Sequence, residues 1–295
     1  MKTWAELMVA VVERLSAKTE ARTAYTYERA LWQFEFEDKP TLDVLIDRTR
    51  RWKARGLSNG TIAHRYCAIK WVLKNFPREF DPIDVREMLT FMEGVTPDVR
   101  EMDCATRAAA EDIIRNAPAR EALAIGMAYY GGLRLGEIAQ SRLSDWTFDK
   151  ATGRLSLLIP SPPTARTKTG RERRIPVMPQ LAALFETYVK GERRARLIST
   201  GMKTDALLLT SQGRKATGIS RRALYEGIVT ACKACGYEHL HPHAFRHGLA
   251  TILAAKTNDI KLIKEVLGHR NVQSTLRYIH KAQDEIADSM ATAFS

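Results

Sequence analysis

Apolar side chains recur at intervals of three and four residues through most of the chain, which is the spacing that predicts amphipathic helices. In the first hundred residues this pattern forms four stripes, and the first begins at a capping box made by Thr3 and Glu6. The stripes cover residues 4–15, 24–34, 42–52 and 62–76. Gly56 and Pro77 end the last two stripes. We therefore expect a helical domain of four or five short helices over residues 1–93.

Residues 94–104 interrupt this pattern. They are polar, contain Pro97 and lack apolar periodicity, so we interpret them as an interdomain linker. Helical spacing then returns over residues 106–117 and 119–130, and three short stretches of strand character follow it: WTFD, RLSLLIP and RRIPVM. Helical spacing resumes at Gln180 and continues to the end. The pattern predicts a mainly α fold with a small β-sheet, in which a mixed α/β domain occupies residues 105–295.

The charge balance adds a class of partner to this picture. The 295 residues, enough for two domains with separate cores, include 46 Lys and Arg against 34 Asp and Glu, a net charge of +12. The first hundred residues carry 17 basic and 15 acidic side chains, so the excess lies beyond them. A balance of this size favours a polyanionic partner such as DNA, although a generic basic protein would share it.

The apolar and cysteine patterns favour a reducing cytoplasm. The first apolar stripe contains an acidic residue, unlike a signal peptide, and no apolar run is long enough to span a membrane. The cysteines are Cys67, Cys104, Cys232 and Cys235, and the CKAC motif has no second ligand pair at zinc spacing. We interpret the last two as small apolar residues on one helical face.

Residues 241–280 combine cations, imidazoles and a phenol. His243 and Arg246 lie one helical turn apart, His269 ends a Leu-Gly-His triplet, and Tyr278 follows nine residues later. These groups are what cleavage of a phosphodiester by a tyrosine nucleophile requires. Histidines at such spacing could instead bind a metal, but the carboxylate cluster of a magnesium nuclease is missing, so we expect neither metal nor cofactor.

Two further segments carry candidate cations. Arg134 follows a glycine pair at the start of a predicted helix, and Glu137, three residues later, can orient its guanidinium. A surface ion pair would explain this arrangement equally well. Between the second and third predicted strands, five cations occupy nine positions, and either a solvated hairpin or a phosphate clamp would explain them: Arg166, Lys168, Arg171, Arg173 and Arg174.

Together these motifs resemble the active site of the tyrosine recombinases, the phage-integrase and Xer family, and the resemblance covers essentially the whole chain. It implies a SAM-like helical core-binding domain over residues 1–93 and a catalytic domain over residues 105–295. Because the core-binding helices begin almost at once, no additional arm-binding domain is expected. The resemblance implies this catalytic set, with Glu137 and His247 in support: Arg134, Lys168, His243, Arg246, His269 and Tyr278.

The implied reaction is site-specific DNA recombination through a 3′-phosphotyrosine intermediate. The two arginines would hold the phosphate, His243 would act as acid, base or phosphate donor, and His269 as a second donor. The family carries a lysine at the place of Lys168, and an ammonium gives up a proton more readily than a guanidinium does. A type IB topoisomerase and a non-catalytic DNA-binding regulator are the alternatives.

The resemblance also implies the partners. Duplex DNA with inverted-repeat core sites would bind a homotetramer, or a heterotetramer shared with a second recombinase, in the cytoplasm at the nucleoid. The apolar stripe of Ile286, Met290 and Phe294 would pack on its own domain or dock into a neighbouring protomer. The expected DNA contacts come from the polar face of the helix over residues 62–76 and from the cation-rich hairpin: His64, Arg65, Lys70, Lys74, Arg166, Arg171 and Arg173.

Overall fold

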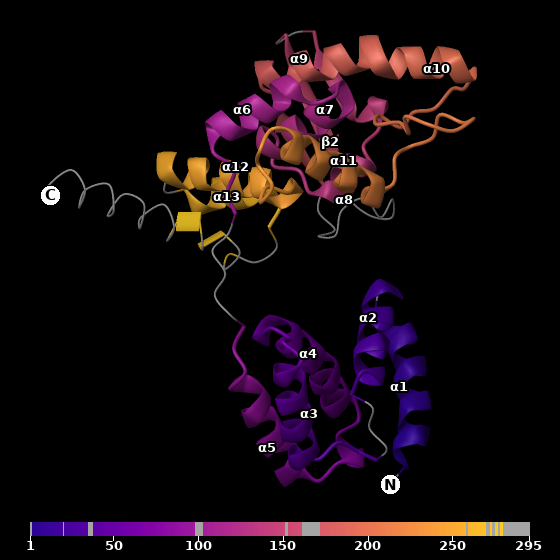
Figure 1. Ribbon diagram of the computed structural model, residues 1–295, viewed down its shortest axis with the longest axis vertical. Coiled ribbons are helices and arrows are strands. Elements are labelled where there is room, and N and C mark those ends of the chain that lie inside the picture. Colours follow the sequence, from indigo (N-terminus) through magenta and orange to yellow (C-terminus); the bar gives the residue numbers. More distant parts are fainter. Residues whose placement is uncertain are drawn as a thin grey trace, which may run out of the picture. The chain divides into compact units, whose positions relative to one another are not determined.

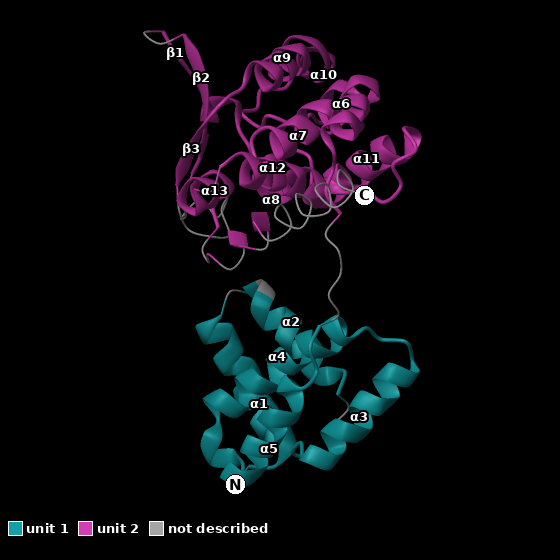
Figure 2. Cartoon of the chain, turned by 90° about the vertical axis from the view of Figure 1, so that its left-hand side faces the viewer, with its two compact units in different colours: residues 1–101 teal, residues 102–295 magenta. Residues whose placement is uncertain are grey.

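The computed structural model describes residues 2–19, 21–34, 38–97, 103–150, 153–160, 172–257, 259–269, 272, 275, 276, 278 and 279. The chain divides into two compact units, residues 1–101 and 102–295 (Figure 2). This division lies inside the segment 94–104 that lacks apolar periodicity. None of the helices in the described ranges is both long enough and apolar enough to cross a membrane.

Unit 1 is a helical domain whose core gathers around its longest helix. Its helices are α1 (Trp4–Lys18), α2 (Ala21–Trp32), α3 (Leu42–Ala54), α4 (Asn59–Asn75) and α5 (Pro82–Glu93), with a 3-10 turn at Pro77–Glu79. Helix α4 contacts α2, α3 and α5 (Figure 1). Its Tyr66 lies in the core beside Phe34 and hydrogen-bonds to the Thr49 hydroxyl. The capping box of Thr3 and Glu6 is confirmed.

Unit 2 is a mixed domain with a small sheet. Its elements before the sheet are α6 (Arg107–Asn116), α7 (Ala119–Tyr129), α8 (Leu135–Ala139) and a 3-10 turn at Leu143–Asp145. The strands are β1 (Trp146–Asp149), β2 (Arg154–Ile159) and β3 (Arg173–Pro176). The elements after the sheet are α9 (Pro179–Tyr188), a π-helical turn (Val189–Arg193), α10 (Arg194–Thr200), α11 (Arg221–Ala234), α12 (Pro242–Lys256) and α13 (Ile260–Leu267).

Helix α7 is the centre of unit 2. All of its residues from Glu121 to Tyr129 are buried, as expected for a helix surrounded by other elements. It contacts α6, α9, α11 and α12 (Figure 1). The sheet is antiparallel in the order β1-β2-β3, and the register pairs Leu157 with Trp146 on one side and with Ile175 on the other. The predicted fold class, mainly α with a small β-sheet, is confirmed.

The helical spacing predicted from Gln180 onward is interrupted between α10 and α11. Residues 201–220 cross the domain with buried leucines at 207, 208 and 209. Their backbone is held by tertiary partners, since Leu207 donates to the Ser141 carbonyl and the buried Arg193 side chain donates to the carbonyls of Thr204 and Ala206. This segment has a fixed path without being helical, because its backbone groups are paired with partners outside it and across its own turn, where Thr210 donates to the Thr217 carbonyl.

Candidate active site

The site forms where the start of α8 meets the end of α13 and the start of β3. Helix α7 ends in a turn that contains Gly132, whose φ of +64° suits glycine. Arg134 then caps α8, and Glu137 lies in its first turn. The Arg134 backbone N–H donates to Glu137 Oε2 at 2.9 Å, and its Nη1 donates to Oε1 at 3.1 Å. The expected pairing of these two residues is present, and the carboxylate is buried.

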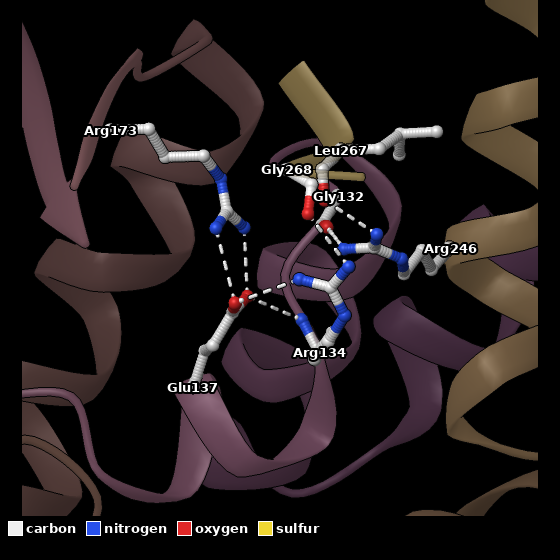
Figure 3. Close-up of polar contacts among 7 residues, drawn as sticks. All are labelled: Gly132, Arg134, Glu137, Arg173, Arg246, Leu267 and Gly268. Atoms are coloured by element: carbon white, nitrogen blue, oxygen red, sulfur yellow. Dashed lines mark hydrogen bonds and ion pairs between the residues drawn. The ribbon is translucent and has the colours of Figure 1, made fainter. Parts of the chain in front are cut away.

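A second arginine shares this carboxylate. Arg173, the first residue of β3, donates from Nη1 to Glu137 Oε1 at 3.1 Å and from Nη2 to Oε2 at 2.7 Å (Figure 3). Burial raises the pKa of Glu137, but the hydrogen bonds and charges of Arg173 and Arg134 outweigh this effect and hold it below its usual value. The carboxylate is therefore ionised and faces two guanidinium groups.

Arg246 meets Arg134 at the C-terminal end of α13. It lies on α12, is 3% exposed, and donates to the carbonyls of Gly132 and Leu267 (Figure 3). Arg134 Nη2 donates to the next carbonyl, that of Gly268, at 2.9 Å. Helix carbonyls of this kind carry partial negative charge and stabilise cations. Burial, and then the charge of Arg134, lower the pKa of Arg246 to about 9, so it stays cationic at neutral pH.

Gly268 allows this convergence by its lack of a side chain. It ends α13 with a φ of +61°, in the left-handed region. A Cβ atom at this position would lie 2.7 Å from Nη1 of Arg173. The Leu-Gly-His triplet thus provides two carbonyl acceptors for arginines and the space that a third arginine occupies.

The phenol of Tyr278 lies among imidazoles. It is 2% exposed, and its hydroxyl lies 2.6 Å from Nδ1 of His247. The ring of His269 stacks on Tyr278 with centroids 6.1 Å apart, and His269 Nδ1 lies 2.9 Å from the Thr275 hydroxyl. Sequence reasoning placed His247 in support of the catalytic set, and the structure puts it against the phenol itself.

His243 lies one turn before His247 on α12, with the two rings 6.2 Å apart. Its imidazole is exposed at the surface. Partial desolvation by the surrounding protein, and then the charge of Arg246, lower its pKa. Helix α12 itself lies against the start of unit 2, because a Cβ at Gly248 would be 2.3 Å from the Ala105 carbonyl oxygen.

Some expected residues fall outside the described ranges, and one lies in the site with a partner that was not expected. Lys168, Arg166 and Arg171 fall outside the described residues, as does the terminal stripe at residues 286–294. Arg173, expected as a DNA contact, has a side chain only 9% exposed, and it pairs with Glu137 instead of facing solvent. Sequence reasoning gave no sign of this pair, since the partners are 36 positions apart.

The polar face of α4 is exposed at only some of the expected positions. His64 and Lys74 are exposed, whereas Lys70 is half-buried. The guanidinium of Arg65 lies over the Trp52 ring, 4.5 Å from its centroid, which holds it against the helical core.

The comparisons with known proteins identify the family. Residues 102–285 match the model of the phage integrase family, which is more than half of the chain. The chain belongs to the phage integrase family. The resemblance that the sequence motifs indicated is therefore confirmed, and the site residues from Arg134 to Tyr278 lie within the matched region.

Individual members of the phage integrase family resemble this chain at low identity. The tyrosine recombinase XerC of Oceanobacillus iheyensis is 29% identical over 170 residues, which cover 58% of this chain and 52% of that relative. Its counterpart in Bacillus subtilis is 24% identical over 258 residues, covering 86% of this chain and 81% of the relative. The match thus spans about half the length of the first relative and most of the second.

Solved structures show that the fold is shared. The XerH site-specific recombinase bound to a palindromic difH substrate has a TM-score of 0.73 at 18% identity, covering 92% of this chain and 80% of that one. A lambda integrase dimer bound to a COC′ core site has a TM-score of 0.70 at 15% identity, covering 94% and 95%.

Proposed function

We propose that the chain is an enzyme of site-specific DNA recombination, which cleaves and rejoins DNA through a 3′-phosphotyrosine intermediate. The observation that carries this proposal is the convergence of two guanidinium groups and a phenol. Arg134 and Arg246 meet at the end of α13, and Tyr278 is close enough for its negative form to stabilise the charge of Arg246. The relatives' shared name, tyrosine recombinase, supports the same function.

In the proposed reaction, the Tyr278 oxygen attacks a DNA phosphorus atom. Arg134 and Arg246 stabilise the negative charge that grows on the non-bridging oxygens in the pentacoordinate transition state. Among the described residues, the bonds to Glu137 and Gly268 use two of the five N–H donors of Arg134, which leaves donors for a phosphate. The exposed His243 and the half-buried His269 would be further donors to the phosphate.

Lys168 is proposed to protonate the departing 5′ oxygen. The products are then a 3′-phosphotyrosine bond and a free 5′-hydroxyl. The 5′-hydroxyl of the partner strand reverses the step, so the bond energy is kept in the ester and ATP is not required. A lysine suits this task because its pKa lies closer to neutrality than that of its arginine neighbours.

Duplex DNA is the proposed partner. The related structures are named for their DNA, a palindromic difH substrate and a COC′ core site, which supports inverted-repeat core sites for this chain too. In unit 2 a groove lined in part by His269 carries more cations than carboxylates, since Arg173, Arg174, Lys261 and Lys264 outnumber Glu172 and Glu265. In unit 1 the exposed His64 and Lys74 are candidates for phosphate contacts.

The proposed assembly is a homotetramer on two core sites, with a heterotetramer as the alternative, in the cytoplasm at the nucleoid. Tetramers would account for exchange between two duplexes, which a type IB topoisomerase acting on one duplex does not perform. Membership of the phage integrase family does not favour a topoisomerase or a non-catalytic regulator.

The Tyr278→Phe variant tests the proposal. It removes one hydroxyl and its contact with His247 but keeps the buried ring, so the variant should fold and bind DNA like the wild-type chain. On a nicked suicide substrate, the wild-type chain should accumulate a covalent protein–DNA complex and the variant none. A covalent complex at the wild-type level in Tyr278→Phe would exclude this residue as the nucleophile.

A further inference from the structure

Among the described residues, the base nearest to the Tyr278 hydroxyl is His247, which follows Arg246, and not His243, which precedes it. His247 Nδ1 lies 2.6 Å from the phenolic oxygen, at the short end of the range in which proton transfer between a base and a nucleophile occurs. The rings are tilted, with centroids 5.5 Å apart, so the two side chains meet through their polar atoms. This contact joins residues 31 positions apart in the sequence.

The surroundings of the phenol create a need for such a base. Tyr278 is 2% exposed and belongs to an apolar cluster with Ala250, Ile263 and Leu267, so bulk solvent has little access to its hydroxyl. A phenol has a pKa near 10 and is a weak nucleophile at neutral pH unless a neighbouring group takes its proton. A neutral imidazole with its proton on Nε2 presents a lone pair at Nδ1, the atom that faces Tyr278.

His243 occupies a different position. Its side chain is exposed, and its electrostatic neighbours are Arg246 first, then His241 and other cations. Its exposure and its cationic neighbours suit a donor to a phosphate held by the arginines. A cationic neighbourhood also weakens an imidazole as a proton acceptor, because it disfavours the protonated form.

We propose that His247, and not His243, accepts the phenolic proton of Tyr278 as the phosphotyrosine bond forms. The inference rests on the proposed function. In the forward step the O–H bond of Tyr278 breaks, its oxygen forms the bond to phosphorus, and the proton moves to His247 Nδ1. The bond from phosphorus to the 5′ oxygen breaks, and that oxygen takes its proton from the general acid. Rejoining returns the His247 proton to Tyr278, so protons and charge balance over the cycle.

The test lowers the pKa of the phenol at position 278, so that cleavage depends less on a base. His247→Asn keeps an oxygen acceptor near the place of Nδ1 but cannot carry a proton, and His243→Asn is the matched control on the same helix. Each chain is made with tyrosine or with a ring-fluorinated tyrosine of lower pKa at position 278. The measured quantity is the rate of covalent complex formation on the nicked suicide substrate, with the urea-denaturation midpoint as the measure of folding.

With ordinary tyrosine, His247→Asn should be slower than the wild-type chain by about 10²- to 10⁴-fold, the usual contribution of a general base. The fluorinated ring should recover at least about a tenfold part of that loss, because a more acidic phenol needs less help from a base. His243→Asn should show no such selective recovery. DNA affinity of His247→Asn should stay within about twofold of wild type, because His247 is not among the proposed phosphate donors. His243→Asn loses a proposed phosphate donor, so all rates are compared at saturating enzyme.

Three results would overturn the inference while the wild-type chain still cleaves DNA. These are cleavage by His247→Asn at or above the wild-type rate, an equal response of all chains to fluorination, and selective recovery of His243→Asn alone. A wild-type chain that forms no covalent complex would instead overturn the proposed function on which the inference rests.

Discussion

At the scale of single residues, the site depends on one carboxylate that serves two guanidinium groups. Glu137 is 5% exposed and accepts hydrogen bonds from Arg134 and Arg173. Its charge is the described negative charge closest to both cations, whereas Arg246 is held by backbone carbonyls. We infer that Glu137 fixes the side chain of Arg134 before any phosphate arrives, which would lower the reorganisation that catalysis requires.

Replacing this carboxylate should cost stability. In Glu137→Gln two buried or half-buried guanidinium groups lose their compensating charge, and breaking a buried pair in this way typically costs about 3–5 kcal/mol. Urea denaturation should show a loss of that size in the free energy of unfolding. Glu111→Gln is the matched control, because its ion pair with Arg107 is exposed and its removal should change the midpoint little. Equal effects of the two substitutions would contradict the account.

Stability should also fall on acidification in two stages. His243 has a lowered pKa in the folded chain, so the unfolded chain binds its proton more readily, and stability declines as pH falls through the unfolded value near 6.5. Glu137 has a lowered pKa as well, so its contribution is present above 4.5 and is lost as pH falls through its folded value. His243→Gln should remove part of the first decline only, and Glu137→Gln the second. Urea-denaturation midpoints measured across this pH range test the assignment. It would be wrong if His243→Gln removed the decline at lower pH and Glu137→Gln the decline at higher pH.

The sequence predicts only part of this residue-scale arrangement. The pairing of Arg134 with Glu137 follows from their i, i+3 spacing at a helix start. The pairing of Arg173 with the same carboxylate depends on how β3 packs against α8. Residue spacing within either element does not predict that packing. The acceptors of Arg246 are backbone carbonyls. Every residue has such a carbonyl, so the sequence does not indicate which ones accept.

At the scale of elements, the side chain of Arg193 holds the non-helical segment of residues 201–220 in place. Arg193 is buried and donates to the carbonyls of Thr204 and Ala206, and this path brings Leu207 to the Ser141 carbonyl. Apolar periodicity predicted most of the helices, because their buried residues recur at helical spacing, and the three strands were predicted from short apolar, β-branched or aromatic runs. It missed the interruption between α10 and α11, because the backbone of those residues is held by irregular hydrogen bonds, several of them to distant residues such as Ser141 and Arg193.

Removing the Arg193 guanidinium should loosen this segment. Arg193→Met keeps most of the side-chain volume but leaves buried carbonyls without donors, so stability should fall by about 2 kcal/mol or more. Hydrogen exchange should accelerate more at the Leu207 amide, and at the Leu143 amide, which donates to the Asp205 carbonyl, than within α7. Arg194→Met, at the exposed neighbouring position, serves as the control. Unchanged exchange at Leu207 would show that the guanidinium does not organise the segment.

At the scale of the whole molecule, two units with separate cores carry different parts of the proposed task. Unit 1 offers a helical surface with exposed polar positions on α4. Unit 2 contains the arginines, the imidazoles and the phenol, and lies almost entirely within the region that matches the family. The central claim is that unit 2 forms a covalent bond to DNA through Tyr278.

The most direct test is to identify the atom pair that becomes linked. Covalent complexes of the wild-type chain with a suicide substrate are digested with protease and nuclease, and the nucleotide-bearing peptide is identified by mass spectrometry. The account predicts a nucleotide joined through its 3′ phosphate to the peptide that contains Tyr278. Attachment to another residue, or through a 5′ phosphate, would contradict it.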